Sequence, residues 1–197
     1  MNNSAQGGGW QRGIALPTTG PEANTLYHFS EESDISVFAP RPVKANPDSE
    51  PLVFTIDAEH APLYFLPRDC PRAAWWALPT TTPKDQEKWL SKTDARMIIA
   101  VESGWLQRIQ DCKLFAYRFA PHGFVSLQDH GVHVSQETQT PLSVEPVGDL
   151  IERILTAGVE LRFTPSLWPL QRALMPTTLH WSFIRMRNAT PETPRRA

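Results

Sequence analysis

A histidine near the N-terminus is the first candidate for chemistry in this sequence. His28 stands in the segment Leu-Tyr-His-Phe-Ser, and a polar, acidic stretch follows it at once. On a short strand the imidazole would be held rigidly and could form a hydrogen bond with a ligand hydroxyl. A hydrogen bond to a neighbouring backbone carbonyl is the structural alternative, and the sequence leaves both open.

Arginines flanked by prolines form the second candidate group. Arg41 stands between two prolines, and the Pro-Arg-Asp-Cys-Pro-Arg segment at 67–72 carries Arg68 and Arg72. Because proline restricts the backbone, these guanidinium groups have less conformational entropy to lose when they bind an anion. A phosphate or carboxylate ligand would suit them. Ion pairs with Asp69 and other acids would instead give them a structural role.

Two further side chains could take part in a reaction. Glu137 ends a short β-like run, and a carboxylate there could stabilise a cation that develops in a substrate. Tyr64 follows an expected helix start, so its ring could reach a cleft lined by the first strand. The alternatives are a solvated turn glutamate and a tyrosine packed in the core.

Cysteines and histidines give no pattern typical of a nucleophile or a metal site. Cys70 has cationic neighbours that could lower its pKa, but no partner at a diagnostic spacing supports it, so we expect a buried structural thiol. His130 and His133 are three residues apart. On a strand this spacing turns the two rings to opposite faces, and we therefore expect no metal.

The elements that would position these residues are mostly short strands. Strands are expected at 25–29, 52–56, 73–78, 96–102, 113–119, 124–127, 132–135, 142–145, 159–163 and 179–186. Helices are expected at 83–90, directly after Pro146, and after a cap at Thr164 or Ser166. This order favours an α+β fold, a single domain with a mixed, mostly antiparallel sheet and several short helices.

Length and composition indicate one domain. The chain has 197 residues, of which 41% are hydrophobic and 20% charged, enough for a core that buries about 70% of the unfolded surface. Residues 1–24 are rich in glycine and proline and are predicted to form a flexible tail. The domain itself is expected at 25–187, with a second flexible tail at 188–197.

The overall charge and the apolar runs limit the possible partners and the location. A net charge of -2 without a block of basic residues gives no strong signal for nucleic-acid binding. No apolar run approaches the roughly 20 residues of a membrane helix, and no signal pattern is visible, so no membrane is expected as a partner and the cytoplasm is the expected location. The oligomeric state stays open.

Several segments together resemble a bacterial family of uncharacterised proteins, described as a domain of unknown function. They are residues 26–30, 53–57, 67–72, 145–150 and 164–169. The resemblance covers about residues 25–189, which is nearly the whole expected domain. It implies a family, without a function.

A more distant resemblance implies a function and an ADP-ribosyltransferase-like fold. A Leu-Tyr-His strand, then a strand that leads into a helix with a tyrosine, then a late glutamate, is similar to the His-Tyr-Glu pattern of the ADP-ribosyltransferase superfamily. The resemblance implies that His28 bonds a ribose hydroxyl of NAD, Tyr64 stacks on nicotinamide, and Glu137 favours the oxocarbenium-like transition state. Glu102 and Glu145 are other choices for the glutamate. NAD would be the co-substrate.

Two alternatives stay beside this interpretation. The RNA phosphotransferase-like branch of the same superfamily works with a histidine and arginines. In that case Arg41, Arg68 and Arg72 would hold a phosphate, and with His28 and Tyr64 they would form the nucleotide-binding set. The second alternative is a binding or interaction module without catalysis.

Overall fold

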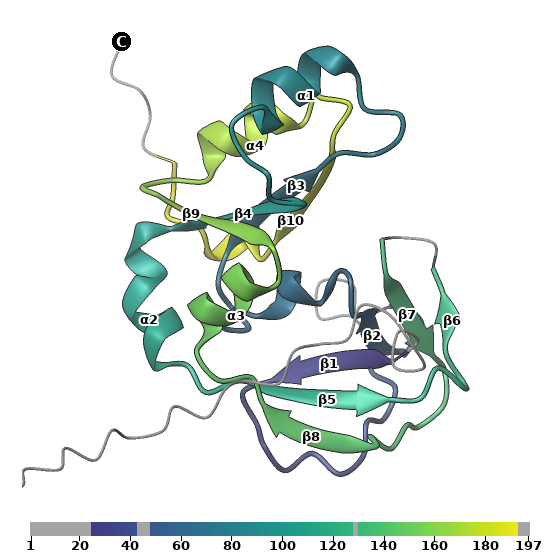
Figure 1. Ribbon diagram of the computed structural model, residues 1–197. Coiled ribbons are helices and arrows are strands. Elements are labelled where there is room, and N and C mark those ends of the chain that lie inside the picture. The colour runs from purple at the N-terminus through teal and green to yellow at the C-terminus, as the bar shows by residue number, and fades with distance from the viewer. Residues whose placement is uncertain (1–24, 43–47, 128–129, 193–197) are drawn as a thin grey trace, which may run out of the picture.

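Two β-sheets with short helices between and around them make up the computed structural model (Figure 1), which describes residues 25–42, 48–127 and 130–192. The α+β fold and its mostly antiparallel pairing confirm the prediction from the sequence, but the strands divide between two sheets. The N-terminal tail predicted at 1–24 lies outside the described residues.

The first sheet has six strands in the order β6-β7-β2-β1-β5-β8, and every neighbouring pair is antiparallel. Its strands are β1 (Leu26–Ser30), β2 (Val53–Asp57), β5 (Phe115–Phe119), β6 (Val125–Ser126), β7 (Val132–Ser135) and β8 (Ser143–Pro146). On β1, Tyr27 and Phe29 pack against the core between the sheets, whereas Leu26 joins a cluster on the opposite face. This alternation decides which way His28 points.

The second sheet has four strands in the order β10-β3-β4-β9, with β4 and β9 parallel and the other pairs antiparallel. Its strands are β3 (Arg72–Trp76), β4 (Met97–Glu102), β9 (Val159–Thr164) and β10 (His180–Ile184). The continuous apolar run predicted a central strand, and β4 is indeed buried along its whole length.

The helices are short. They are η2 (Ala61–Tyr64), α1 (Pro83–Leu90), η3 (Ser103–Trp105), α2 (Leu106–Asp111), α3 (Leu150–Thr156), α4 (Trp168–Leu174) and η4 (Met186–Asn188). The N-cap side chain accepts a hydrogen bond at the start of two of them, α1 and α3. The Thr82 side chain accepts a hydrogen bond from the N–H of Asp85 and caps α1, which begins at a proline.

One predicted helix start is wrong. Pro146 ends β8 instead of opening the helix, because Gly148 turns the chain at a φ of 86° and Asp149 then caps α3. The helix predicted after a cap at Thr164 or Ser166 is α4, whose N-cap residue is Leu167, and the Ser166 hydroxyl accepts a hydrogen bond from the N–H of Trp168 at 3.4 Å.

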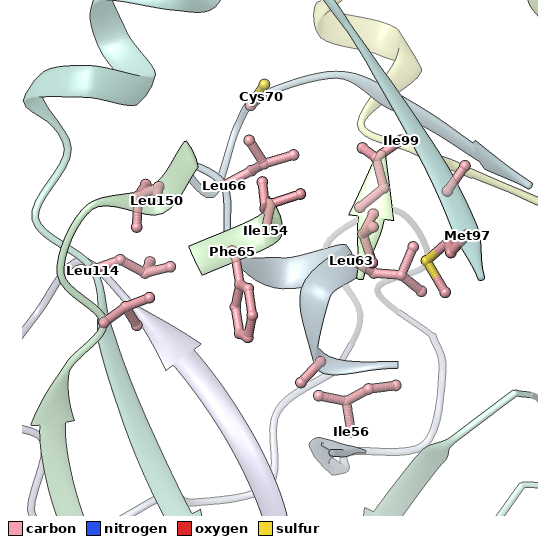
Figure 2. Close-up of a cluster of buried hydrophobic side chains, with 14 of the residues drawn as sticks. Ile56, Leu63, Phe65, Leu66, Cys70, Met97, Ile99, Leu114, Leu150 and Ile154 are labelled. Carbon is pink, nitrogen blue, oxygen red and sulfur yellow. The ribbon is translucent and has the colours of Figure 1, made fainter. Parts of the chain in front are cut away.

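The main core lies between the two sheets (Figure 2). Side chains of η2 and α3 and of both sheets point toward one another there. Residues of this core labelled in Figure 2 are Ile56, Leu63, Phe65, Leu66, Cys70, Met97, Ile99, Leu114, Leu150 and Ile154. A second cluster packs α1 and α4 against the other face of the second sheet. The space between the sheets is therefore closed by apolar packing along its middle.

A buried carboxylate ties the segment after η4 to the second sheet. Glu102, only 2% exposed, accepts hydrogen bonds from the N–H of Leu167 and from the N–H and hydroxyl of Thr190. The Thr190 carbonyl in turn accepts from the indole of Trp168. These contacts extend the packed structure into the first residues of the stretch predicted as the C-terminal tail.

Candidate functional site

The segment 67–72, which we call the PRDCPR loop, is a tight turn that leads into β3. The N–H of Cys70 donates to the carbonyl of Pro67 at 2.9 Å. One guanidinium nitrogen of Arg72, Nη1, donates to the carbonyls of Cys70 at 3.0 Å and of Pro67 at 3.4 Å. The loop thus folds around the first side chain of the strand that follows it.

Arg72 is a buried cation without an anionic partner among the residues that the structure describes. It is 2% exposed, and its guanidinium carbon lies 5.6 Å from the centre of the Tyr64 ring. Its Nε has no hydrogen-bond partner among the described residues. Burial lowers the pKa of Arg72, and no carboxylate of the described chain is among the groups whose charge acts on it. Carbonyl oxygens and a ring face surround the charge without balancing it.

Arg185 brings a second positive charge to the same loop. Ile184 pairs with Arg72 across the β3–β10 ladder, so Arg185 follows directly beside it. The Arg185 Nε donates to the carbonyl of Arg68 at 3.1 Å, and the nearest ion pair is a weak one with Asp69 at 3.9 Å. Arg185 lies in the left-handed region, with a φ of 57°. The sequence analysis missed this residue because its place depends on strand pairing.

The thiol in the loop is structural, as the sequence indicated. Cys70 is fully buried, and this burial raises the pKa of its thiol to about 12 despite the nearby charge of Arg72. The other cysteine, Cys112, is buried too, and its pKa is raised to about 11. Neither cysteine forms the thiolate that a nucleophile needs at neutral pH.

His28 points to the face of the first sheet that lies away from the PRDCPR loop. Its Nδ1 donates to the carbonyl of Phe54 at 2.9 Å, and its ring meets that of Phe38 at 4.9 Å. Burial lowers the pKa of His28, opposed by the Phe54 hydrogen bond and assisted by the charge of Arg68. Tyr64 packs against the core on the other face. The strand alternation therefore separates His28 from Tyr64.

Arg41 and Glu137 lie near the segment that covers His28. The N–H and carbonyl of Arg41 form a bridge with Leu52, and Phe38 pairs in the same way with Gln139. Glu137 is exposed, in a turn where its N–H donates to the hydroxyl of Ser135.

The candidate residues thus form two groups in space. His28 contacts Phe38, and Arg41 and Glu137 belong to the two segments that Phe38 joins by its bridge to Gln139. Tyr64 and Arg72 lie together at the PRDCPR loop, which also contains Arg68. The charge of Arg68 acts on the pKa of His28, so the groups are within electrostatic range of each other. Their side chains do not meet in one place.

A second cluster of polar residues was not predicted from the sequence. At the end of β2, Asp57 accepts hydrogen bonds from the N–H and from the Nδ1 of His60, both at 2.8 Å. Burial alone would raise the pKa of Asp57, but the hydrogen bonds from His60 and the charges of His60 and His133 lower it overall. The carboxylate is therefore ionised at neutral pH and can only accept hydrogen bonds.

Aromatic rings from both sheets close around this pair. The ring of Trp76, at the end of β3, lies 5.6 Å from that of His60, 5.6 Å from that of His130 and 4.3 Å from that of His180. The chain has six histidines, and four of them lie at or next to this place: His60, His130, His133 and His180. We call Asp57, His60, Trp76, His130 and His180 the histidine cluster.

A glycine allows the close approach in the histidine cluster. Gly131 has a φ of 85°, and its carbonyl accepts from the N–H of Asp57. A Cβ at this position would lie 2.5 Å from His60 Nδ1 and 2.6 Å from Asp57 Oδ1. His130 and Gly131 could have suggested a sharp turn from sequence, but nothing local indicates the distant partners.

Within the described ranges, no group of three or more histidine, cysteine, aspartate or glutamate side chains is arranged to hold a metal ion. The same part of the chain contains no helix that is long and apolar enough to cross a membrane.

Comparison with protein families assigns the chain. A family model described as a family of unknown function, DUF6886, matches residues 27–189. The chain belongs to this family, and this assignment confirms the resemblance to uncharacterised proteins. The match covers both sheets, the PRDCPR loop and the whole histidine cluster. Neither the curated proteins nor the solved structures gave a match.

Proposed function

We propose that this domain binds a phosphate-bearing ligand at the PRDCPR loop. The observation that carries the proposal is the guanidinium of Arg72, which is buried, lacks a carboxylate partner, and keeps an N–H without an acceptor in the described chain. An anion at this place would supply the missing countercharge.

The physical reason is the cost of a buried charge. Removing a cation from water costs several kcal/mol unless good contacts compensate it, and each unsatisfied buried donor adds about 1–3 kcal/mol. Two carbonyls and the ring of Tyr64 compensate Arg72 in part. A phosphate oxygen accepts charge-assisted hydrogen bonds from guanidinium groups and would compensate it further.

Two more side chains suit such a ligand. Arg185 is partly exposed, with 26% of its side-chain surface accessible, and its charge adds to that of Arg72. Tyr64 presents a ring beside the charges, and a flat base or nicotinamide could stack on it. A nucleotide combines a phosphate with a flat ring, so AMP, NAD and ADP-ribose are the ligands to test first.

Cleavage of NAD is a separate step of the proposal. It would need His28 and Glu137 to reach the same ligand as Tyr64, and the positions of these three residues favour binding over transfer. We therefore propose binding as the function, with release of nicotinamide from NAD as the additional activity to assay.

A thermal-shift titration with inorganic phosphate, AMP, NAD and ADP-ribose tests this proposal. At a hundredfold excess over Kd a ligand stabilises the folded state by about 2.7 kcal/mol, which raises Tm by roughly 5–10 °C for a chain of this length. We expect at least one nucleotide to raise Tm. Arg185→Ala should lower the apparent affinity for that nucleotide at least tenfold.

A control variant separates binding from stability. Arg96→Ala removes another arginine whose Nε donates to a backbone carbonyl, that of Ala157, away from the loop. It should lower Tm without changing the ligand-induced shift. Absence of any shift at millimolar ligand, or an equal loss of affinity in both variants, would overturn the proposal.

A further inference from the structure

We infer that Asp57 and His60 form a general-base pair, in which Nε2 of His60 takes a proton from water during hydrolysis of a small ester. This inference does not depend on ligand binding at the PRDCPR loop. It rests on the hydrogen bonds, the surroundings and the position of the pair.

The hydrogen bonds fix which nitrogen of His60 carries the proton. Asp57 Oδ1 accepts at 2.8 Å from His60 Nδ1, and an ionised carboxylate has no proton to give. Neutral His60 therefore holds its proton on Nδ1 and keeps a lone pair on Nε2. No hydrogen bond from a described residue engages Nε2. A base that is oriented by a carboxylate through its other nitrogen is the arrangement that proton transfer needs.

The pair is held rigidly. The backbone N–H of His60 also donates to Asp57 Oδ1, and the N–H of Asp57 donates to the carbonyl of Gly131. That carbonyl also accepts from Nδ1 of His133 at 3.0 Å. The backbone of Gly131 thus closes over the pair, and its missing side chain leaves room for the close approach. Such support is what a preorganised proton-transfer group requires.

The surroundings offer flat surfaces for a ligand. Trp76, the last residue of β3, is buried and packs against the rings of His130, in the turn before β7, and His180, the first residue of β10. The centres of the His130 and His180 rings are 3.3 Å apart, and both rings are partly exposed, whereas only 13% of the His60 side chain is accessible. A small ester with an aromatic group could stack on these rings, and the limited exposure would strengthen interactions with the imidazole. This points to aryl esters as the substrate class.

The place of the cluster separates it from the PRDCPR loop. Arg72 and Trp76 are the first and last residues of β3 and point to the same side of its sheet, about 13 Å apart at the rise of an extended strand. Substitutions at His60 should therefore leave the arginines in place, and the two proposals can fail separately.

The chemistry balances with water as the only co-reactant. The water oxygen bonds to the acyl carbon while Nε2 of His60 takes one of its protons, and the carbonyl electrons move to the acyl oxygen. When these electrons return, the bond to the leaving phenol oxygen breaks. That oxygen receives the proton from Nε2, which restores neutral His60. The products are a carboxylic acid and a phenol.

Hydrolysis of p-nitrophenyl acetate measures this activity. We expect the wild-type chain to exceed its His60→Gln variant at least tenfold in kcat/KM. Asp57→Asn should lower the rate by a similar factor, since it leaves the imidazole without its orienting carboxylate. The control His122→Gln removes an exposed histidine on a turn and should keep the wild-type rate.

A spectroscopic readout distinguishes a base from a merely structural histidine. ¹⁵N NMR of the imidazoles should show neutral His60 with its proton on Nδ1, and this preference should disappear in Asp57→Asn. Circular dichroism and Tm check that each variant folds. If His60→Gln folds and hydrolyses the ester as fast as wild type, or if neutral His60 carries its proton on Nε2, the inference is wrong. A Tm increase with Zn²⁺ that His60→Gln abolishes would also overturn it, because Nε2 would then be a metal ligand.

Discussion

Replacing Gly131 with alanine should destabilise the protein far more than the same change at Gly148. Both glycines have almost the same positive φ, 85° and 86°. A Cβ at Gly148 would meet nothing within 4 Å, whereas a Cβ at Gly131 would lie against His60 and Asp57. Gly148→Ala is thus a matched control that measures the cost of the backbone alone.

The magnitude follows from two contributions. An alanine in the left-handed region costs about 1–2 kcal/mol, and both variants lose this amount. At Gly131 the new Cβ would lie 2.5 Å from Nδ1 of His60, while ordinary contacts begin at 3.4 Å, so the pair must move by about 1 Å. This movement breaks the hydrogen bonds between His60 and Asp57, whose loss costs a further 1–3 kcal/mol or so.

Urea unfolding followed by tryptophan fluorescence measures both variants. The chain has seven tryptophans, and Trp76 reports on the histidine cluster itself. We expect Gly148→Ala to lose about 1–2 kcal/mol of unfolding free energy and Gly131→Ala about 2–5 kcal/mol, with unchanged m-values. Equal losses within about 0.5 kcal/mol would show that the backbone of residue 131 does not press on the Asp57–His60 pair, and would refute the reasoning.

Two further predictions concern buried and ionised carboxylates. Glu102→Gln replaces one accepting oxygen with an NH₂ group, which would face the donor of Leu167 or those of Thr190. We therefore expect the unfolding free energy in urea to fall by about 1–3 kcal/mol and proteolysis after residue 186 to become faster. Unchanged values for both would contradict this role. Asp57 has a lowered pKa when folded, and its stabilising contribution should be present above the unfolded value of about 3.9 and disappear as the pH falls through the folded value. Asp57→Asn should therefore lose less stability than wild type between pH 6 and pH 3, and equal losses would show that His60 does not stabilise the carboxylate.

Local patterns in the sequence predicted most elements because the causes were local. The alternation along 113–119 marked β5, the apolar run in 96–102 marked β4, and the Thr82 cap with Pro83 marked the start of α1. The division into two sheets has no such signal. It depends on which strands pair, and β4 pairs with β9, about sixty residues further along the chain. Non-local pairing is decided by the packing of the whole domain.

The same distinction explains which parts of the candidate sites could be predicted. Arg72 and Tyr64 are close in sequence, and the structure places the guanidinium of Arg72 over the ring of Tyr64. Arg68 contributes its backbone carbonyl, which accepts from Arg185. His28 lies apart from this loop because Tyr27 and Phe29, its neighbours on β1, face the core between the sheets. A residue between two core residues on a strand points away from that core.

The β3–β10 ladder shows how one pairing register creates both candidate sites. Trp76 pairs with His180 at one end of the ladder, and Arg72 pairs with Ile184 at the other, which sets Arg185 beside the PRDCPR loop. A shift of this register by one residue would turn His180 to the opposite face and move Arg185 away from Arg72. The large buried rings of β3 oppose such a shift, since Trp75 and Trp76 occupy different cores on the two faces. The adjacent tryptophans therefore position the charges and the imidazoles, although neither tryptophan takes part in the proposed proton transfer.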